Sequence, residues 1–150
     1  MRLKTPQAVQ LIISAILMWI ISIYADNFWF IFKYNNELTL FCLILGGTII
    51  VFGIVAFREA EKTITPLHPY KVSSLVTGGI YQYTRNPMYF GLLLILFSIA
   101  FYLQNLASIF VLPIYIWFIS KYQIMPEEEA LYKLFGQEYK NYQNKIRRWI

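Results

Sequence analysis

Long stretches without a single charged residue constrain this chain more than any other feature of its sequence. Residues 5–25 form one such run and residues 38–57 form a second. Each run reaches the length of about 20 residues that an α-helix needs to cross the hydrocarbon core of a bilayer. The two runs therefore predict two transmembrane helices.

A third uncharged run, residues 88–120, is too long for one helix and slightly short for two full spans. Gln104 and Asn105 lie at its middle, where a polar pair favours a turn. The run predicts a tight hairpin of two short helices, residues 88–103 and 106–122, with the amide pair at the turn.

The amino-acid composition is typical of an integral membrane protein. Hydrophobic residues make up 58% of the sequence and charged residues 14%, which excludes a water-exposed globular surface. The lone Cys42 lies inside an apolar run, so no disulfide is expected. The first run is longer than the apolar stretch of a signal peptide, so we do not expect it to be a cleavable signal. The predicted fold class is all-α: a polytopic membrane protein with four transmembrane helices, a cytoplasmic loop and a C-terminal amphipathic helix.

The basic residues indicate how these spans are oriented. Twelve of the 13 basic residues precede the first span, lie between the second and third, or follow the fourth, and only Lys33 falls on the other side. This asymmetry predicts cytoplasmic termini and a cytoplasmic 58–87 connection. The basic residues flank apolar segments, which indicates membrane lipids rather than nucleic acid as partners. The spans lack charged residues, which argues against an ion path.

Polar chemistry is concentrated in two segments, residues 58–87 and 121–150. The first is rich in Thr, Ser, Pro and Gly, which favours turns and ordered loop. Its His68 reads as a solvated loop residue, and with no second histidine a metal site is not expected. From Pro126 the second segment reads as a helix interrupted at Gly136, with Trp149 and Ile150 at the membrane interface.

The most informative stretch runs from Leu75 to Tyr89 and leads directly into the third span. Pro87 fits the first turn of a helix and Asn86 its cap, so the positive end of the helix dipole would lie beside Arg85 and could hold an anion. Gly78 and Gly79 would let backbone approach a ligand closely. The alternative is that Arg85 anchors to lipid phosphate and the tyrosines form an aromatic belt.

Three consecutive glutamates, Glu127 to Glu129, follow Pro126 just after the hairpin. Acidic residues in a first helical turn complement the helix dipole, and this structural role alone would explain them. They also fall at the same predicted membrane face as Arg85. A ligand could therefore be held with its anion near Arg85 and its hydroxyl or amine groups near the glutamates.

Two sequence marks resemble the isoprenylcysteine carboxyl methyltransferase family and its bacterial and phospholipid-methylating relatives. The first is Leu75-Val-Thr-Gly-Gly-Ile-Tyr81 followed by Tyr83-Thr-Arg-Asn-Pro-Met-Tyr-Phe-Gly91. The second comprises Glu127-Glu128, Leu131, Phe135-Gly136, Tyr139 and Tyr142. The resemblance covers residues 60–150, whereas residues 1–57 match only as generic membrane helices.

The chain departs from the family pattern at a few positions. Asn86 stands where the eukaryotic motif has His, and Gly78 precedes Gly79 where Ser is common. Glu129 makes a triplet of the usual pair, so the assignment to Glu127 and Glu128 follows from their spacing to Leu131. His68 and Lys71 lie out of register with the family and receive no role.

The resemblance implies a methyltransferase that uses S-adenosylmethionine and a hydrophobic small-molecule or lipid-like acceptor. The chain would then be one integral membrane domain, residues 1–150, with two variable spans in 1–57 and the cofactor-binding half in 58–150. Arg85 is the residue that we assign to catalysis. The residues that the resemblance assigns to the cofactor are Leu75, Val76, Gly79, Tyr81, Arg85, Asn86, Pro87, Tyr89, Glu127 and Glu128.

Two other functions remain open at the level of sequence. An NADPH-dependent membrane reductase of the sterol-reductase type has a similar C-terminal half, although the short loops here leave little room for a dinucleotide. A non-enzymatic accessory or lipid-binding protein would use the same residues structurally. The small size and the lack of a targeting signal lead us to expect a prokaryotic inner membrane.

Overall fold

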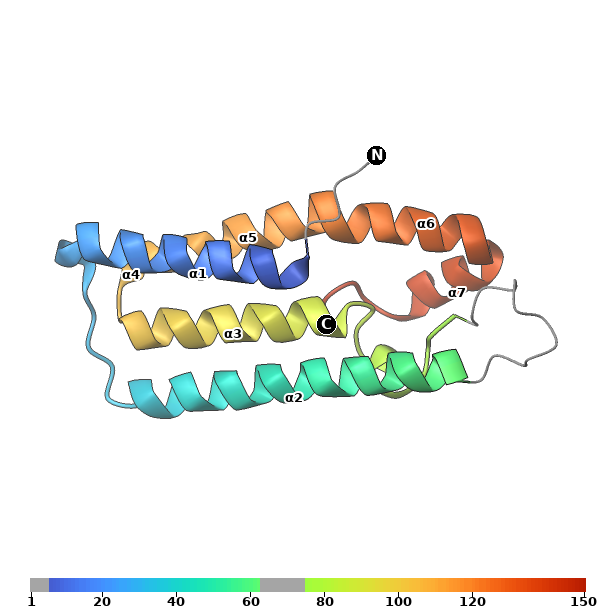
Figure 1. Cartoon of the computed structure of the whole chain (residues 1–150), viewed down its shortest axis with the longest axis horizontal. Coiled ribbons are helices and arrows are strands. Elements are labelled where there is room, and N and C mark those ends of the chain that lie inside the picture. The colour runs from blue at the N-terminus through green and yellow to red at the C-terminus, as the bar shows by residue number, and fades with distance from the viewer. Residues whose placement is uncertain (1–5, 63–74) are drawn as a thin grey trace.

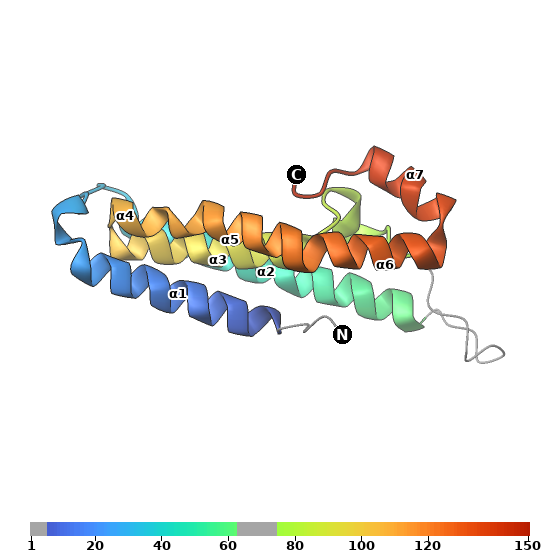
Figure 2. The same ribbon diagram turned by 90° about the horizontal axis from the view of Figure 1, so that it is seen from above.

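The structure, a computed structural model, describes residues 6–62 and 75–150. Every regular element within these ranges is a helix, and the long helices lie side by side in an elongated bundle (Figures 1 and 2). This confirms the predicted all-α class. Segment 63–74, which contains His68 and Lys71, lies outside the described residues, so the loop predicted there is not described.

The first two apolar runs form the two long helices at the start of the bundle. Helix α1 spans Gln7–Tyr24, and helix α2 spans Asn35–Lys62, with the short 3₁₀ helix η1, Asp26–Phe28, between them. Among the described residues, three helical stretches are long and apolar enough to cross a membrane: Gln7–Tyr24, Asn35–Ala60 and Leu106–Phe135. Helix α3, Pro87–Leu103, is apolar but shorter.

The third run folds as a hairpin whose turn is the amide pair. Helix α3 ends at Leu103, and Gln104 adopts a left-handed conformation with φ of 49°. The side-chain oxygen of Asn105 then accepts hydrogen bonds from the N–H groups of Ala107 and Ser108, which caps α4, Leu106–Ile109. Its Nδ2 donates to the Ala25 carbonyl at 2.7 Å, so the turn is tied to the end of α1.

The returning arm is longer than predicted. It continues from α4 through α5, Val111–Ile119, a π-helical turn, Ser120–Ile124, and α6, Met125–Phe135. The π turn ends two residues before Pro126, which has no N–H to donate to the carbonyl one turn earlier, and the wider turn accommodates the proline within a continuous helix. The predicted end of this arm at residue 122 is therefore wrong.

Beyond α6 the chain folds back on the bundle (Figures 1 and 2). Gly136 takes φ of 53°, and α7, Gln137–Lys145, follows it, so the predicted interruption at Gly136 is confirmed. Residues 146–150, here called the tail segment, then run back toward the start of α3. Ile146 is extended and Trp149 packs against the apolar core, so the prediction of an interfacial helix containing Trp149 and Ile150 is wrong.

Helices α2 and α3 approach one another through two glycines. A Cβ placed at Gly91 would lie 2.6 Å from the carbonyl oxygen of Gly46, so the backbones touch there. The core itself lies between α1, α3 and the returning arm, around Met18, Leu96 and Ile119. Large apolar side chains on the outer faces of α1 and α2 are exposed, including Ile12, Trp19, Phe41 and Ile44. Such a surface requires apolar surroundings, as membrane lipids provide.

Candidate functional site

The two sequence marks meet at one end of the bundle. The Arg85 Nη1 atom, just before α3, lies 3.0 Å from Oε1 of Glu128 in the first turn of α6. The hydroxyl of Tyr89 donates to Oε1 of Glu127 at 3.0 Å. Pro87 begins α3, as predicted, and is fully buried. The structure therefore brings the basic start of α3 and the acidic start of α6 together.

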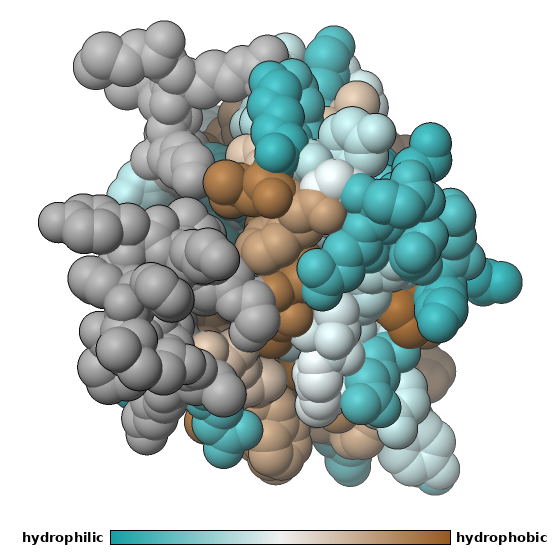
Figure 3. All heavy atoms as spheres, turned by 90° about the vertical axis from the view of Figure 1, so that its right-hand side faces the viewer, coloured by the Kyte–Doolittle hydropathy of each residue, from teal (hydrophilic) through white to brown (hydrophobic). Residues whose placement is uncertain are grey.

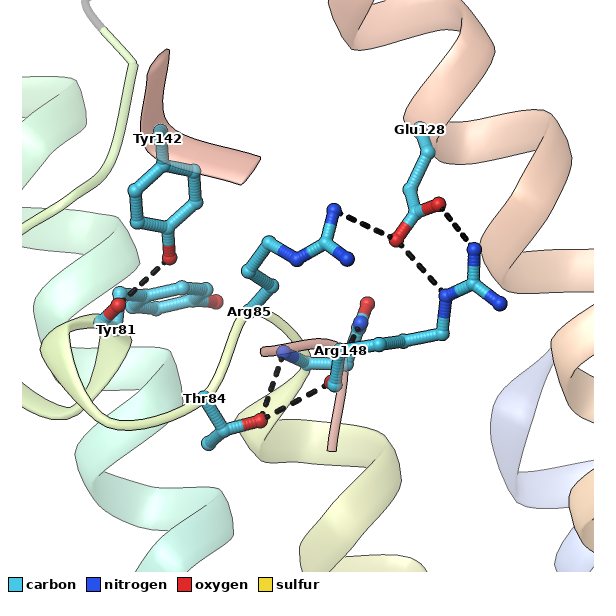
Figure 4. Close-up of polar contacts among 7 residues, drawn as sticks. Tyr81, Thr84, Arg85, Glu128, Tyr142 and Arg148 are labelled. Atoms are coloured by element: carbon cyan, nitrogen blue, oxygen red, sulfur yellow. Dashed lines mark hydrogen bonds and ion pairs between the residues drawn. The ribbon is translucent and has the colours of Figure 1, made fainter. Parts of the chain in front are cut away.

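Arg148 of the tail segment joins this pair, and the sequence analysis missed it. Its Nε and Nη2 atoms donate to Oε1 and Oε2 of Glu128 at 3.1 and 2.7 Å (Figure 4). These hydrogen bonds raise the pKa of the Arg148 guanidinium above its usual value. One carboxylate is thus shared by two guanidinium groups, one from the residue before Asn86 at the start of α3 and one from the tail segment.

The backbone of the tail segment is fixed to the start of α3. The Arg147 carbonyl accepts a hydrogen bond from the Arg85 N–H at 3.1 Å. The Arg148 carbonyl accepts from Asn86 Nδ2 at 3.0 Å and from Thr84 Oγ1 at 3.3 Å. Asn86 occupies the cap position of α3 without a side-chain capping bond, because its amide is turned to the tail instead. The expectation that Asn86 caps this helix is therefore correct in position and wrong in mechanism.

Tyrosines connect this cluster to the segment before α3. The Tyr142 hydroxyl donates to the Tyr81 carbonyl at 2.6 Å (Figure 4). Burial, and then the negative charge of Glu127, raise the pKa of Tyr81 to about 12. Burial is also the main cause that raises the pKa values of Tyr139 and Tyr142. All three phenols therefore stay protonated at neutral pH and act as neutral groups.

Arg85 is incompletely paired. Its contact with Glu128 is an ion pair whose angle does not make a hydrogen bond, and its Nε is buried with no hydrogen-bond partner in residues 6–62 and 75–150. A buried guanidinium N–H without a partner is costly. This makes Arg85 a candidate for binding an anionic group.

Two adjoining hollows lie between the end of α2 and the segment before α3. The larger, about 420 Å³, is lined by Phe52, Val55, Ala56, Glu59, Gly79, Ile80 and Tyr83. The smaller, about 300 Å³, is lined by Ala56, Glu59, Ala60, Leu75, Val76, Thr77, Gly78 and Gly79. Gly79 lines both, and its φ of 59° is one that a side chain would strain.

The predicted site residues therefore fall into two groups. Leu75, Val76 and Gly79 line the smaller hollow. The ion-pair cluster contains Arg85, Asn86, Pro87, Tyr89, Glu127 and Glu128, none of which lines either hollow. Tyr81 connects the two groups. It belongs to the same short helix as Gly79, η2, Gly79–Gln82, and its pKa is raised by burial and by the charge of Glu127. Figure 3 shows this end of the bundle, where a strip of apolar side chains lies beside a hydrophilic area.

An apolar helical bundle with helices long enough to cross a membrane defines an integral membrane protein, and this one has a charged cluster at the start of α3. The model of the phospholipid methyltransferase family matches residues 36–138, and the chain belongs to this family. Its two sequence marks and its relatives make it a member of the isoprenylcysteine carboxyl methyltransferase type.

Relatives and a solved structure support this placement. A protein-S-isoprenylcysteine O-methyltransferase of Dictyostelium discoideum is 32% identical over 80% of this chain and 54% of its own length. One from Schizosaccharomyces pombe is 29% identical over 78% of this chain and 50% of its own length. The structure of the eukaryotic intramembrane Ras methyltransferase, isoprenylcysteine carboxyl methyltransferase, superimposes with a TM-score of 0.69 at 27% identity, covering 98% of this chain and 54% of that one. The chain spans about half the length of the curated relatives that it matches.

Proposed function

We propose that this protein transfers a methyl group from S-adenosylmethionine to a hydrophobic or lipid-like acceptor at the cytoplasmic face of a membrane. The observation that carries the proposal is the convergence of Arg85 and Glu128 at 3.0 Å. It unites the two sequence marks of a methyltransferase family at one end of an apolar bundle. A purely structural role would not require an incompletely paired arginine at that point.

The residues present fit this methyl donor. The amino-acid end of S-adenosylmethionine carries a carboxylate and an ammonium group. The cluster offers Arg85, whose buried Nε has no hydrogen bond within the described residues, and the carboxylates of Glu127 and Glu128. The adenosyl part would be held at the smaller hollow by Leu75, Val76 and Gly79, with Tyr81 between the two. Asn86 and Pro87 set the start of α3, and Tyr89 positions Glu127.

The acceptor would enter through the larger hollow. Its lining is mostly apolar, and Phe52 and Val55 belong to the exposed outer face of α2. A hydrophobic molecule dissolved in the bilayer could therefore reach Gly79 from the side, while a soluble donor arrives from water. The hollow falls within the usual volume range of small-molecule sites, about 300–1,000 Å³.

In methyl transfer, the main task of the protein side chains would be to position the donor and the acceptor. When bound, S-adenosylmethionine supplies a methyl group on a positively charged sulfur. Arg85 and the glutamates would fix the direction from which the acceptor approaches, and alignment of two reactants is a large source of acceleration. Apolar walls exclude water, which would compete as a nucleophile. An acceptor that is already a carboxylate or thiolate needs no general base.

The proposed topology has four spans within one domain, residues 1–150, with residues 58–150 forming the cofactor-binding half. Helix α3 would be the fourth, short span, paired with the returning arm in the hairpin. The start of α3 lies beside Gly53 of α2 and points toward the same end of the bundle at which α2 and α6 end (Figure 1). Arg58, Arg85 and Arg148 belong to that end and Lys33 to the other, which favours a cytoplasmic site in a prokaryotic inner membrane.

Binding of S-adenosylhomocysteine to the detergent-solubilised protein tests the proposal. Isothermal titration should show binding that Arg85→Ala and Glu127→Ala weaken. Lys133→Ala is the matched control, because Lys133 is exposed and its ion pair is with Glu129, four residues earlier in α6, and not with Glu127 or Glu128. NADPH serves as the competing ligand for a reductase. The proposal fails if the wild-type protein does not bind S-adenosylhomocysteine at millimolar concentration, or if NADPH binds in its place.

A further inference from the structure

Glu128 of the ion-pair cluster meets two guanidinium groups. Glu128 is shared by Arg85 and Arg148, while the second carboxylate of the cluster, Glu127, accepts a hydrogen bond from the Tyr89 hydroxyl. The side chains of Arg85 and Glu128 are both 11% exposed and that of Arg148 is 35% exposed. Burying the Arg85 guanidinium with its Nε unpaired among the described residues is costly unless an anionic group supplies the missing acceptor.

The geometry shows where that anionic group would bind. Arg148 uses Nε and Nη2 in a bidentate pair with Glu128, whereas Arg85 offers only Nη1 to the same carboxylate. The Nε of Arg85 is buried and makes no hydrogen bond to any residue that the structure describes. Figure 4 shows the two guanidinium groups on adjacent sides of the Glu128 carboxylate. Glu128 therefore holds two cations close together, with donor groups left over.

We propose that Arg148 is a second arginine of the methyl-donor site and that it binds the donor's carboxylate together with Arg85. This inference rests on the proposed function. Glu128 acts as the positioning residue that holds both guanidinium groups in place. Glu127 precedes it in α6 and supplies the negative charge that the donor's ammonium group requires. A zwitterionic amino-acid end thus meets a pair of cations and a carboxylate.

The tail segment is built to present Arg148 whether or not a ligand is bound. Its backbone carbonyls accept three hydrogen bonds, from the Arg85 N–H, Asn86 Nδ2 and Thr84 Oγ1. Trp149 packs against the apolar core next to them. The position of Arg148 is thereby fixed by its backbone and by its neighbour. Binding then does not require the tail to become ordered, which would cost affinity.

Two ligands that differ in the amino-acid part separate this role from a structural one. S-adenosylhomocysteine has the carboxylate and ammonium groups, and 5′-methylthioadenosine has neither. Arg148→Ala in the full-length, detergent-solubilised protein should lower the affinity for S-adenosylhomocysteine about 10- to 100-fold, the loss expected for charged hydrogen bonds. Affinity for 5′-methylthioadenosine should stay within about twofold of wild type, since that ligand never contacts Arg148.

Two further variants make the test specific. Arg148→Lys should bind S-adenosylhomocysteine more weakly than wild type and more tightly than Arg148→Ala, because lysine keeps the charge and loses the fork of donors. Lys145→Ala should change neither affinity, since Lys145 is an exposed basic residue three positions earlier. It controls for a general loss of positive charge at this end of the molecule.

The outcomes distinguish this inference from the proposed function. If wild-type protein binds S-adenosylhomocysteine and Arg148→Ala binds it equally well, the role of Arg148 is wrong while the proposed function stands. Equal weakening of both ligands in Arg148→Ala and Arg148→Lys also overturns the role, since the tail then acts on the fold. Displacement of S-adenosylhomocysteine by phosphatidylglycerol vesicles from wild type, but not from Arg148→Ala, would assign the arginine to a lipid phosphate instead. No binding by wild type overturns both proposals.

Discussion

Replacing Gly91 by alanine tests how closely α2 and α3 must approach. A Cβ at this position would lie 2.6 Å from the carbonyl oxygen of Gly46 and 2.6 Å from Cγ1 of Ile50. The Ile50 side chain can rotate, but the carbonyl belongs to the backbone of α2 and moves only with the helix. Relief therefore requires the two helices to separate over the whole contact, at a cost typical of overpacking, about 1–3 kcal/mol.

Gly47→Ala is the matched control on the facing helix. A Cβ there meets nothing within 4 Å, so the substitution adds no clash. It should leave the free energy of unfolding unchanged or raise it by up to about 1 kcal/mol, the difference in helix propensity between the two residues. Gly91→Ala should therefore lower the free energy of unfolding and Gly47→Ala should not, although both add one methyl group to an apolar helix.

Unfolding in mixed detergent micelles, followed by circular dichroism, measures both variants against wild type. Gly91 lies one turn beyond Pro87, so separation of α2 from α3 would also shift the start of α3 and Arg85 with it. Gly91→Ala should accordingly weaken the binding of S-adenosylhomocysteine as well as lower the free energy of unfolding. A Gly91→Ala protein as stable as wild type, or a Gly47→Ala protein destabilised to the same degree, would refute the reasoning that the Gly46–Gly91 contact sets the approach of α2 and α3.

Two more predictions concern other parts of the fold. Asn105→Ala removes the cap of α4 and leaves the Ala25 carbonyl without its hydrogen-bond donor. It should therefore lower the free energy of unfolding by about 2–4 kcal/mol in the same micelle assay. Asn144 is exposed, so Asn144→Ala should leave the free energy of unfolding unchanged. The raised pKa of Tyr81, about 12 against an ordinary 10.0, means that the folded state holds this phenolic proton more tightly than the unfolded chain. Its contribution is complete below pH 10 and is lost as the pH rises toward 12, so wild type should lose stability in this window more steeply than Tyr81→Phe; equal slopes would refute the assignment.

The parts of the fold that the sequence predicts are those set by local chemistry. A polar pair within an apolar run predicts the hairpin turn, and Gln104 and Asn105 form it. Pro87 predicts the start of α3 because proline suits a first turn. Gly136 predicts a break because it tolerates a positive φ. Each of these signals depends only on the residue itself and its immediate neighbours.

The parts that sequence reasoning misses depend on distant partners. Arg148 follows Lys145 and Arg147, and a basic residue in such a run looks the same whether it meets lipid phosphate or a buried carboxylate. Trp149 suits a membrane interface by type, yet it packs on the core because the chain reverses after α7. The continuation of the returning arm through Pro126 depends on a π turn, for which the sequence has no clear signature.

The length of the hairpin explains why the two marks meet. In an antiparallel hairpin that turns at Gln104 and Asn105, the residue opposite Arg85 is Ile124, since each lies 19 positions from the turn. Glu128 is one helical turn further along α6, about 6 Å, which an arginine side chain spans. The distance between the marks in sequence is therefore fixed by α3 and by the part of the returning arm that lies beside it, and not by a flexible loop. Only the third partner, Arg148, needs a long connection, and the hydrogen bonds of the tail segment to residues 84–86 fix its position.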